Sequence, residues 1–73
     1  MKVRVECYAG SRADERPTAV VFDGTRLPVA EVLDTWYGTD HLYFRLRLAR
    51  GDELLVRRGA DGDWTLEQLV AER

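Results

Sequence analysis

Short runs in which every second residue is apolar, separated by turns that contain glycine, constrain the fold of this 73-residue chain more than any other feature. Residues 3–7 alternate two valines and a cysteine with charged residues, and residues 44–48 alternate Phe and Leu with arginines. A repeat of two residues is the pattern of a β-strand with one buried and one exposed face. The chain is therefore expected to be built from strands.

A tight turn indicates how the first of these strands pair. Asp23-Gly24 separates two apolar runs, and this dipeptide favours a type I′ turn because that turn needs positive φ at both central residues. Such a turn joins neighbouring antiparallel strands into a hairpin. The predicted strands lie at about 3–7, 18–22, 25–30, 44–48, 53–57 and 64–66.

Residues 29–37 fit two different structures. Their apolar residues recur at the spacing of a helix. A strand fits as well if a β-bulge near Ala30-Glu31 shifts the phase, in which case Asp34 and Trp36 share one face. The pattern alone leaves these two alternatives even.

The preferred architecture is all-β: a small antiparallel meander of five to six strands rolled into an SH3-like or partly open barrel, which removes exposed edges. The alternative is an α+β fold with a helix at 29–37. Residues 1–73 are expected to form one domain, with a mobile loop at 9–17 and a tail at 67–73 that ends as a strand, a short helical turn or a frayed end. The predicted core consists of Val3, Val5, Val20, Phe22, Leu27, Val29, Val32, Trp36, Phe44, Leu46, Leu48, Val56, Trp64 and Leu66.

The size and charge of the chain favour a binding module over an enzyme. A globule of this size buries only about 60% of the surface that its unfolded chain exposes, which leaves room for a shallow groove. The net charge of −2 provides no overall attraction for nucleic acid or an anionic membrane, although residues 41–60 sum to +3. A single cysteine, no signal peptide and no apolar stretch of about 18 residues together indicate a cytoplasmic protein without a membrane partner.

Four segments resemble a family of short, uncharacterised bacterial cytoplasmic proteins: VRVECYAG at 3–10, the Asp23-Gly24 hairpin, VAEVLDTWYG at 29–38 and DHLYFRLR at 40–47. The resemblance extends from residue 3 to about residue 66 and implies a strand at 29–37. The same order of elements is distantly similar to a domain of unknown function that tends to be encoded near translesion polymerase genes. Neither resemblance supplies a catalytic motif.

His41 and Cys7 are the residues that an enzyme of this sequence would use. Asp40-His41 followed by Tyr43 could transfer protons, and Cys7 could act with His41 as a nucleophile and base. A lone histidine in a polar turn is more often simply solvated, and Cys7 has the strand parity of the valines expected in the core. We therefore predict no catalytic residue and no cofactor.

Two acidic groups could in principle bind Mg²⁺ or Ca²⁺, namely Asp61 with Asp63 and Glu67, and Asp14 with Glu15. A calcium loop needs further ligands at fixed offsets, and these are absent from the sequence. Plain turns are the better interpretation, and no metal is predicted.

The most basic predicted surface is the outward face of the second hairpin, where Arg45 and Arg47 should lie near Arg57. Like charges across a ladder are destabilising by roughly 0.2 to 1 kcal/mol per direct pair, so this cluster needs a ligand or acidic neighbours. A nucleic-acid surface would use the arginines for phosphates and Tyr43 or Tyr37 for stacking. In the alternative, which we favour, the arginines pair with three acidic residues, Glu6, Glu31 and Asp34.

Exposed tyrosines are the best candidates for contact with a protein. Tyr37 follows Trp36 and should face the opposite side of a strand, and with Tyr8 and Tyr43 it could form an aromatic protein-binding patch of the kind that small SH3-like barrels use. We expect an interaction module that binds a protein; a nucleic-acid accessory module, linked to DNA repair if the distant resemblance holds, is the alternative. A small enzyme using His41 is the least favoured reading, and the oligomeric state stays open. The predicted binding residues are Tyr8, Tyr37, Tyr43, Arg45, Arg47 and Arg57.

Overall fold

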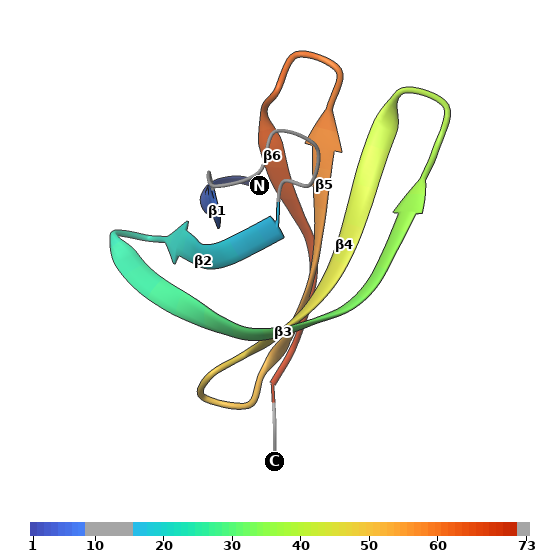
Figure 1. Ribbon diagram of the computed structural model, residues 1–73. Helices are drawn as coiled ribbons and strands as arrows, with labels where there is room; N and C mark the ends of the chain where they lie inside the picture. The colour runs from blue at the N-terminus through green and yellow to red at the C-terminus, as the bar shows by residue number, and fades with distance from the viewer. Residues whose placement is uncertain (9–15, 72–73) are drawn as a thin grey trace.

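Six antiparallel strands form a closed barrel in the computed structural model, which describes residues 1–8 and 16–71 (Figure 1). The strands are β1 (Lys2–Tyr8), β2 (Arg16–Phe22), β3 (Thr25–Tyr37), β4 (His41–Leu48), β5 (Glu53–Gly59) and β6 (Trp64–Val70). Each strand pairs with the next along the chain, and β6 also pairs with β1 to close the barrel. The predicted all-β meander barrel is confirmed.

The segment that fits both helix and strand is the second part of the 13-residue strand β3, so the helical alternative at 29–37 is wrong. Residues 25–28 of β3 pair with β2, and residues 29–37 pair with β4. Figure 1 shows β3 sweeping from the β2 side of the molecule across to β4. Residues 29–37 satisfy their backbone hydrogen-bonding groups by pairing with β4. This pairing outweighs the helical spacing of their apolar residues.

Two bulges in β3 decide which of its side chains face the core. The first is at Ala30, where the predicted break in phase is confirmed. The second, at Leu33, was not predicted. Each bulge adds one residue and exchanges the two faces of the strand beyond it. After Leu33, Asp34 and Trp36 therefore lie opposite Arg45 and Tyr43 on the outside of the barrel.

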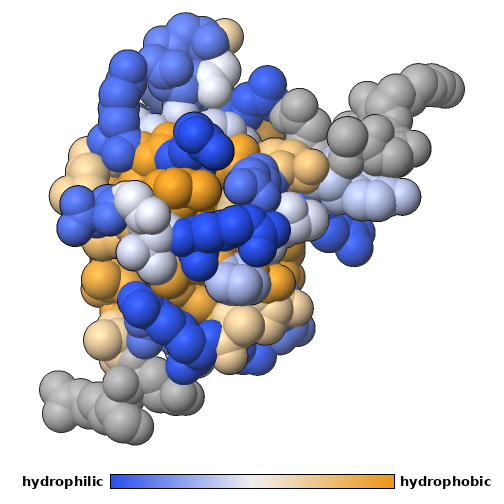
Figure 2. Space-filling view, turned by 90° about the vertical axis from the view of Figure 1, so that its left-hand side faces the viewer, coloured by the Kyte–Doolittle hydropathy of each residue, from blue (hydrophilic) through white to orange (hydrophobic). Residues whose placement is uncertain are grey.

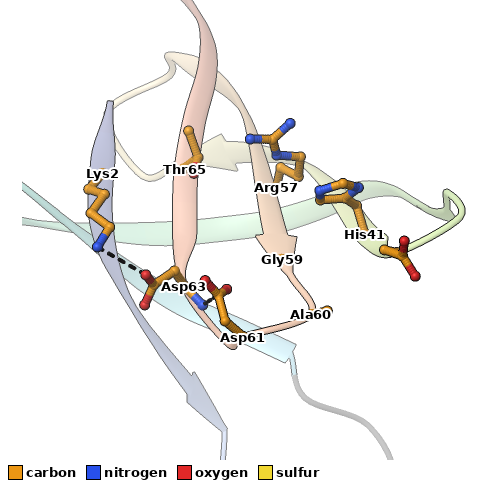
Figure 3. Close-up of a pocket in the computed structure, with 9 residues that line it drawn as sticks. Lys2, His41, Arg57, Gly59, Ala60, Asp61, Asp63 and Thr65 are labelled. Atoms are coloured by element: carbon orange, nitrogen blue, oxygen red, sulfur yellow. Dashed lines mark hydrogen bonds and ion pairs between the residues drawn. The ribbon is translucent and has the colours of Figure 1, made fainter.

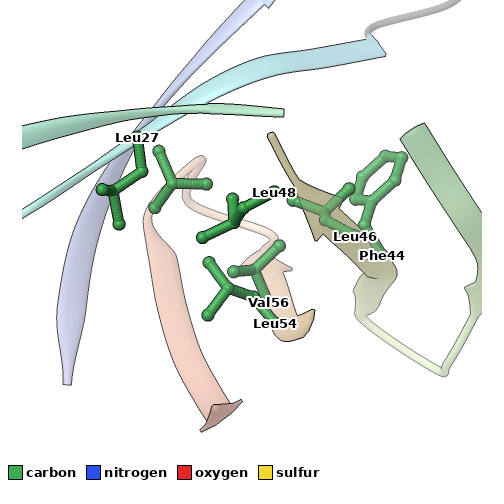
Figure 4. Packing of buried hydrophobic residues seen from close by; sticks show 7 residues of the cluster. Leu27, Phe44, Leu46, Leu48, Leu54 and Val56 are labelled. Carbon is green, nitrogen blue, oxygen red and sulfur yellow. The ribbon is translucent and has the colours of Figure 1, made fainter. Parts of the chain in front are cut away.

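This second bulge makes one core prediction wrong. Trp36 was expected inside, but its exposed fraction is 42%. The other predicted core residues are buried or are half-buried against the core (Figure 4). The structure adds Leu54 and Ala19, which are 3% and 0% exposed. Leu54 joins the core because it lies directly opposite Leu46, which is fully buried.

The first hairpin turns at the predicted residues. Asp23 and Gly24 have φ values of 52° and 78°, as a type I′ turn requires. The predicted loop at 9–17 falls mainly outside the described residues, and Arg16 and Pro17 already belong to β2. The tail continues as strand β6 through Val70.

Candidate functional site

The arginines of the second hairpin are on the outer face of the barrel and are paired with carboxylates from β3. Arg45 Nη2 lies 2.6 Å from Asp34 Oδ2, and Arg47 Nη1 lies 2.7 Å from Glu31 Oε1. The β3–β4 register places each acid directly opposite its arginine. The first bulge brings Glu31 to the outer face, and the second reverses for Asp34 the phase change that the first bulge caused.

The third arginine is also compensated, although more loosely. Arg57 Nε lies 3.7 Å from Glu67 Oε2, and Glu67 is the residue that bulges out of the β5–β6 ladder. Glu6 was expected to reach this cluster, but it pairs with Arg26 at 3.0 Å on the other side of the barrel. Exposed ion pairs of this kind contribute little stability, but they cancel the local positive charge.

An aromatic cluster lies beside these ion pairs on the outer face. The Trp36 and Tyr43 rings are nearly parallel, with an interplanar angle of 8° and centroids 5.4 Å apart, and the His41 ring is 6.3 Å from Tyr43. We refer to Trp36, His41 and Tyr43 as the aromatic surface. Offset stacking of this kind is favourable by about 0.5 to 1.5 kcal/mol beyond area burial, so it holds both rings in place.

The β3–β4 turn supports the Tyr43 ring from one side. The Gly38 N–H donates to the His41 carbonyl oxygen at 2.8 Å, which closes the turn. A Cβ at Gly38 would lie 3.2 Å from Cε2 of Tyr43, a tighter approach than most side chains tolerate. The absence of a side chain at Gly38 therefore lets the Tyr43 ring pack against this turn.

The other two predicted tyrosines do not belong to the aromatic surface. Tyr37 is opposite Leu42 at the end of the strand, on the other side of β3 from Trp36, and is 81% exposed. Tyr8 ends β1 opposite Arg16, and β1 is not a neighbour of the β3–β4 hairpin in the barrel. Of the predicted tyrosines, only Tyr43 is joined to Trp36 by a ring contact, and Trp36 is the binding candidate that sequence reasoning missed.

The sequence itself contains a sign that Trp36 does not lie in the core. In an uninterrupted strand Asp34 and Trp36 share one face, and a carboxylate is rarely buried without a partner. Asp34 therefore argues against a buried Trp36 and for a further phase change before it.

A shallow depression of about 500 Å³ adjoins the aromatic surface, bordered by His41 and Arg57 on one side and by the β5–β6 turn on the other (Figure 3). Gly59 lies directly across from His41 and also lines the depression. Lys2 Nζ is 2.9 Å from Asp63 Oδ2, and this hydrogen bond and charge pair raise the pKa of Lys2. Ion pairing thus occupies part of the depression.

The described residues offer no constellation for metal or nucleophilic catalysis. No three His, Cys, Asp or Glu side chains within residues 1–8 and 16–71 come together so as to hold a metal ion. Asp61 Oδ1 accepts a hydrogen bond from the Asp63 N–H at 3.0 Å, as in an ordinary turn, and Asp14 and Glu15 lie outside the described residues. Cys7 is half-buried on β1, which is not adjacent to the strand that carries His41.

Comparison with known proteins adds no functional assignment. No protein-family model, curated protein or solved structure matches the chain. In the part of the chain that the structure describes, no helix has the length and apolar character needed to cross a bilayer.

Proposed function

We propose that the protein is a small interaction module that binds an extended segment of a protein partner on its aromatic surface. The observation that carries this proposal is the Trp36–Tyr43 stack, which holds a large apolar side chain, 42% exposed, on the outside of the barrel. A tryptophan in this position contributes little to the core. It is the type of residue that dominates the energetics of protein interfaces.

The charges around this surface support a protein ligand over a polyanion. Asp34 and Glu31 neutralise the two arginines next to the stack, and the chain as a whole carries a net charge of −2. A phosphate backbone would have to displace these carboxylates before it could contact the guanidinium groups. A peptide with apolar residues needs no such exchange.

The surroundings of the stack support a peptide over a small molecule. The depression beside it is open and shallow, whereas small-molecule sites enclose most of their ligand. Aromatic side chains next to a shallow groove suit extended peptides, whose side chains dock one by one. We place this activity in the cytoplasm as part of the proposal, since the lone Cys7 makes no disulfide.

Selection from a displayed random-peptide library tests the proposal. The wild-type protein is expected to enrich a family of related sequences that the Trp36→Ala variant no longer retains. Tyr8→Ala is the matched control, because it removes an exposed aromatic ring from a strand that is remote from the aromatic surface, and it should leave binding unchanged. Enrichment that survives Trp36→Ala, or no enrichment at all, contradicts the proposal.

A second candidate function is binding of single-stranded nucleic acid, favoured by the position of Tyr43 directly opposite Arg57. A base could stack on the aromatic ring while the guanidinium group contacts a phosphate. Titration with labelled oligonucleotides at about 20 mM and about 150 mM salt separates the two functions, because phosphate contacts weaken as salt rises.

The Glu31→Gln/Asp34→Asn double variant sharpens that titration. The two substitutions remove the negative charges that pair with Arg45 and Arg47 but keep the shapes of the side chains at 31 and 34. The double variant should therefore bind oligonucleotides more tightly than the wild-type protein. Tight, salt-dependent binding by the wild-type protein itself would replace the protein-binding proposal with the nucleic-acid one.

A further inference from the structure

The strand β6 is paired on both sides along only part of its length. On one side, β5 pairs with β6 from Trp64 to Val70. On the other side, β1 pairs only with Trp64 and Thr65. One further hydrogen bond reaches Leu66, whose N–H donates to the Met1 carbonyl oxygen at 2.7 Å. Residues 67–70 therefore have no strand partner on that side within the described part of the chain. We call this stretch the free edge.

Beyond its first residue, the free edge lacks the usual protection of an exposed strand. Natural edges are guarded by charged residues, prolines or bulges, because unpaired N–H and C=O groups recruit other strands. The only charged residue here is Glu67, which sits at the bulge and pairs with Arg57. Residues 68–71 carry neither charge nor proline.

Apolar side chains gather at the same place. Leu69 lies directly opposite the buried Leu54 and so faces the core side of the sheet, yet it is 46% exposed. Val70 and Met1 are 53% and 69% exposed. Figure 2 shows apolar residues reaching the surface on one side of the barrel, partly crossed by hydrophilic side chains. Leu69 faces inward yet is exposed, because no strand among residues 1–8 and 16–71 covers it at this edge.

We propose that the free edge of β6 pairs with the same edge of a second copy, forming a two-fold antiparallel dimer. A two-fold contact uses one patch twice, so the patch must not repel itself. If Leu69 lies opposite its counterpart, Gln68 faces Val70 and Glu67 faces Ala71 of the other copy. No like charges oppose each other in this register, and both leucines become covered.

The size of the free edge sets the expected strength of this dimer. Four residues from each copy bury less than the roughly 800 Å² per partner of a stable interface, which predicts a weak dimer. The aromatic surface lies at the other end of the barrel, since Val70 is opposite Glu53 whereas His41 is opposite Gly59. Dimerisation would leave both aromatic surfaces accessible, and this inference does not depend on the proposed function.

Sedimentation velocity of the full chain from about 10 µM to about 1 mM tests the dimer, a range suited to so small an interface. The wild-type sedimentation coefficient should rise with concentration as a monomer converts to a dimer. Val70→Lys should raise the dissociation constant at least about tenfold, because a lysine on an edge strand disfavours pairing with another strand. The fold should survive, since the new lysine faces Glu53.

Two further variants keep the test decisive. Gln68→Lys places a charge on the same edge at an exposed position and should weaken the dimer equally. Tyr37→Lys makes the same exchange of an exposed apolar residue for lysine at the other end of the barrel and should leave the dimer unchanged. A wild-type protein that stays monomeric at about 1 mM, or a dimer that survives both edge variants, overturns the proposal.

Discussion

The two tryptophans have opposite roles although both are large apolar residues in strands. Trp64 is half-buried and its ring lies 5.5 Å from that of Phe44, inside the barrel. Trp36 lies outside and its ring contact is with Tyr43. One residue therefore supports the fold, and the other is available for a ligand.

Alanine substitutions distinguish these roles. Trp64→Ala is expected to lower the free energy of unfolding by about 3 kcal/mol, because it leaves a cavity against the core. Trp36→Ala should cost only about 1 kcal/mol, the value of an exposed aromatic pair. Urea denaturation of the two variants measures both values. Equal losses would mean that Trp36 belongs to the core after all.

At the scale of elements, the strand β3 shows what the sequence can and cannot predict. The first bulge was predicted, because Val29 and Val32 cannot share a face without one extra residue between them. The second was missed, because Leu33 is itself apolar and the sign of a break is only indirect, a carboxylate at Asp34 on the face expected to be buried. The second bulge places Asp34 opposite Arg45 on the outer face, and Trp36, two residues further, lies on the same side.

The other elements followed from local chemistry. Alternation in β4 placed Phe44, Leu46 and Leu48 inside and the arginines outside. The predicted pairing of Asp34 and Glu31 with those arginines was also confirmed. The prediction for Glu6 was wrong, because the register of β1, β2 and β3 pairs Glu6 with Arg26 instead. Binding residues were harder to predict because exposure depends on neighbouring strands.

The hairpin of β2 and β3 yields a prediction of its own. A Cβ at Gly24 would meet nothing within 4 Å, so any effect of Gly24→Ala must come from the backbone. At a φ of 78° an alanine is strained, and we expect a loss of about 1 to 2 kcal/mol in the free energy of unfolding. Thermal denaturation measures it. Asp23→Gly is the control and should cost less, because glycine accepts positive φ.

For the whole molecule, the closing contact between β1 and β6 is the weakest part of the barrel. Only Lys2 and Val3 of β1 pair with β6, whereas β4 and β5 pair over nearly their full lengths on both sides. Short ladders open more easily than long ones, since fewer hydrogen bonds hold them. Local opening should therefore begin at this contact.

Amide hydrogen exchange checks this expectation. The slowest exchange should be found in β4 and β5, where Leu46 and Val56 are fully buried, and the amides of β1 should exchange markedly faster. Uniform protection across all six strands would show that the barrel opens only as a unit.

In the proposed interaction module, Trp36 and Tyr43 form the binding surface. The most direct test is a two-dimensional NMR titration of the wild-type protein with a peptide obtained from the display selection. We expect the largest chemical-shift changes at the Trp36 indole N–H, the Tyr43 ring and the Gly38 amide, with the Trp64 indole unchanged. Changes centred on Arg45 and Arg47, with the Trp36 signal unmoved, would contradict it.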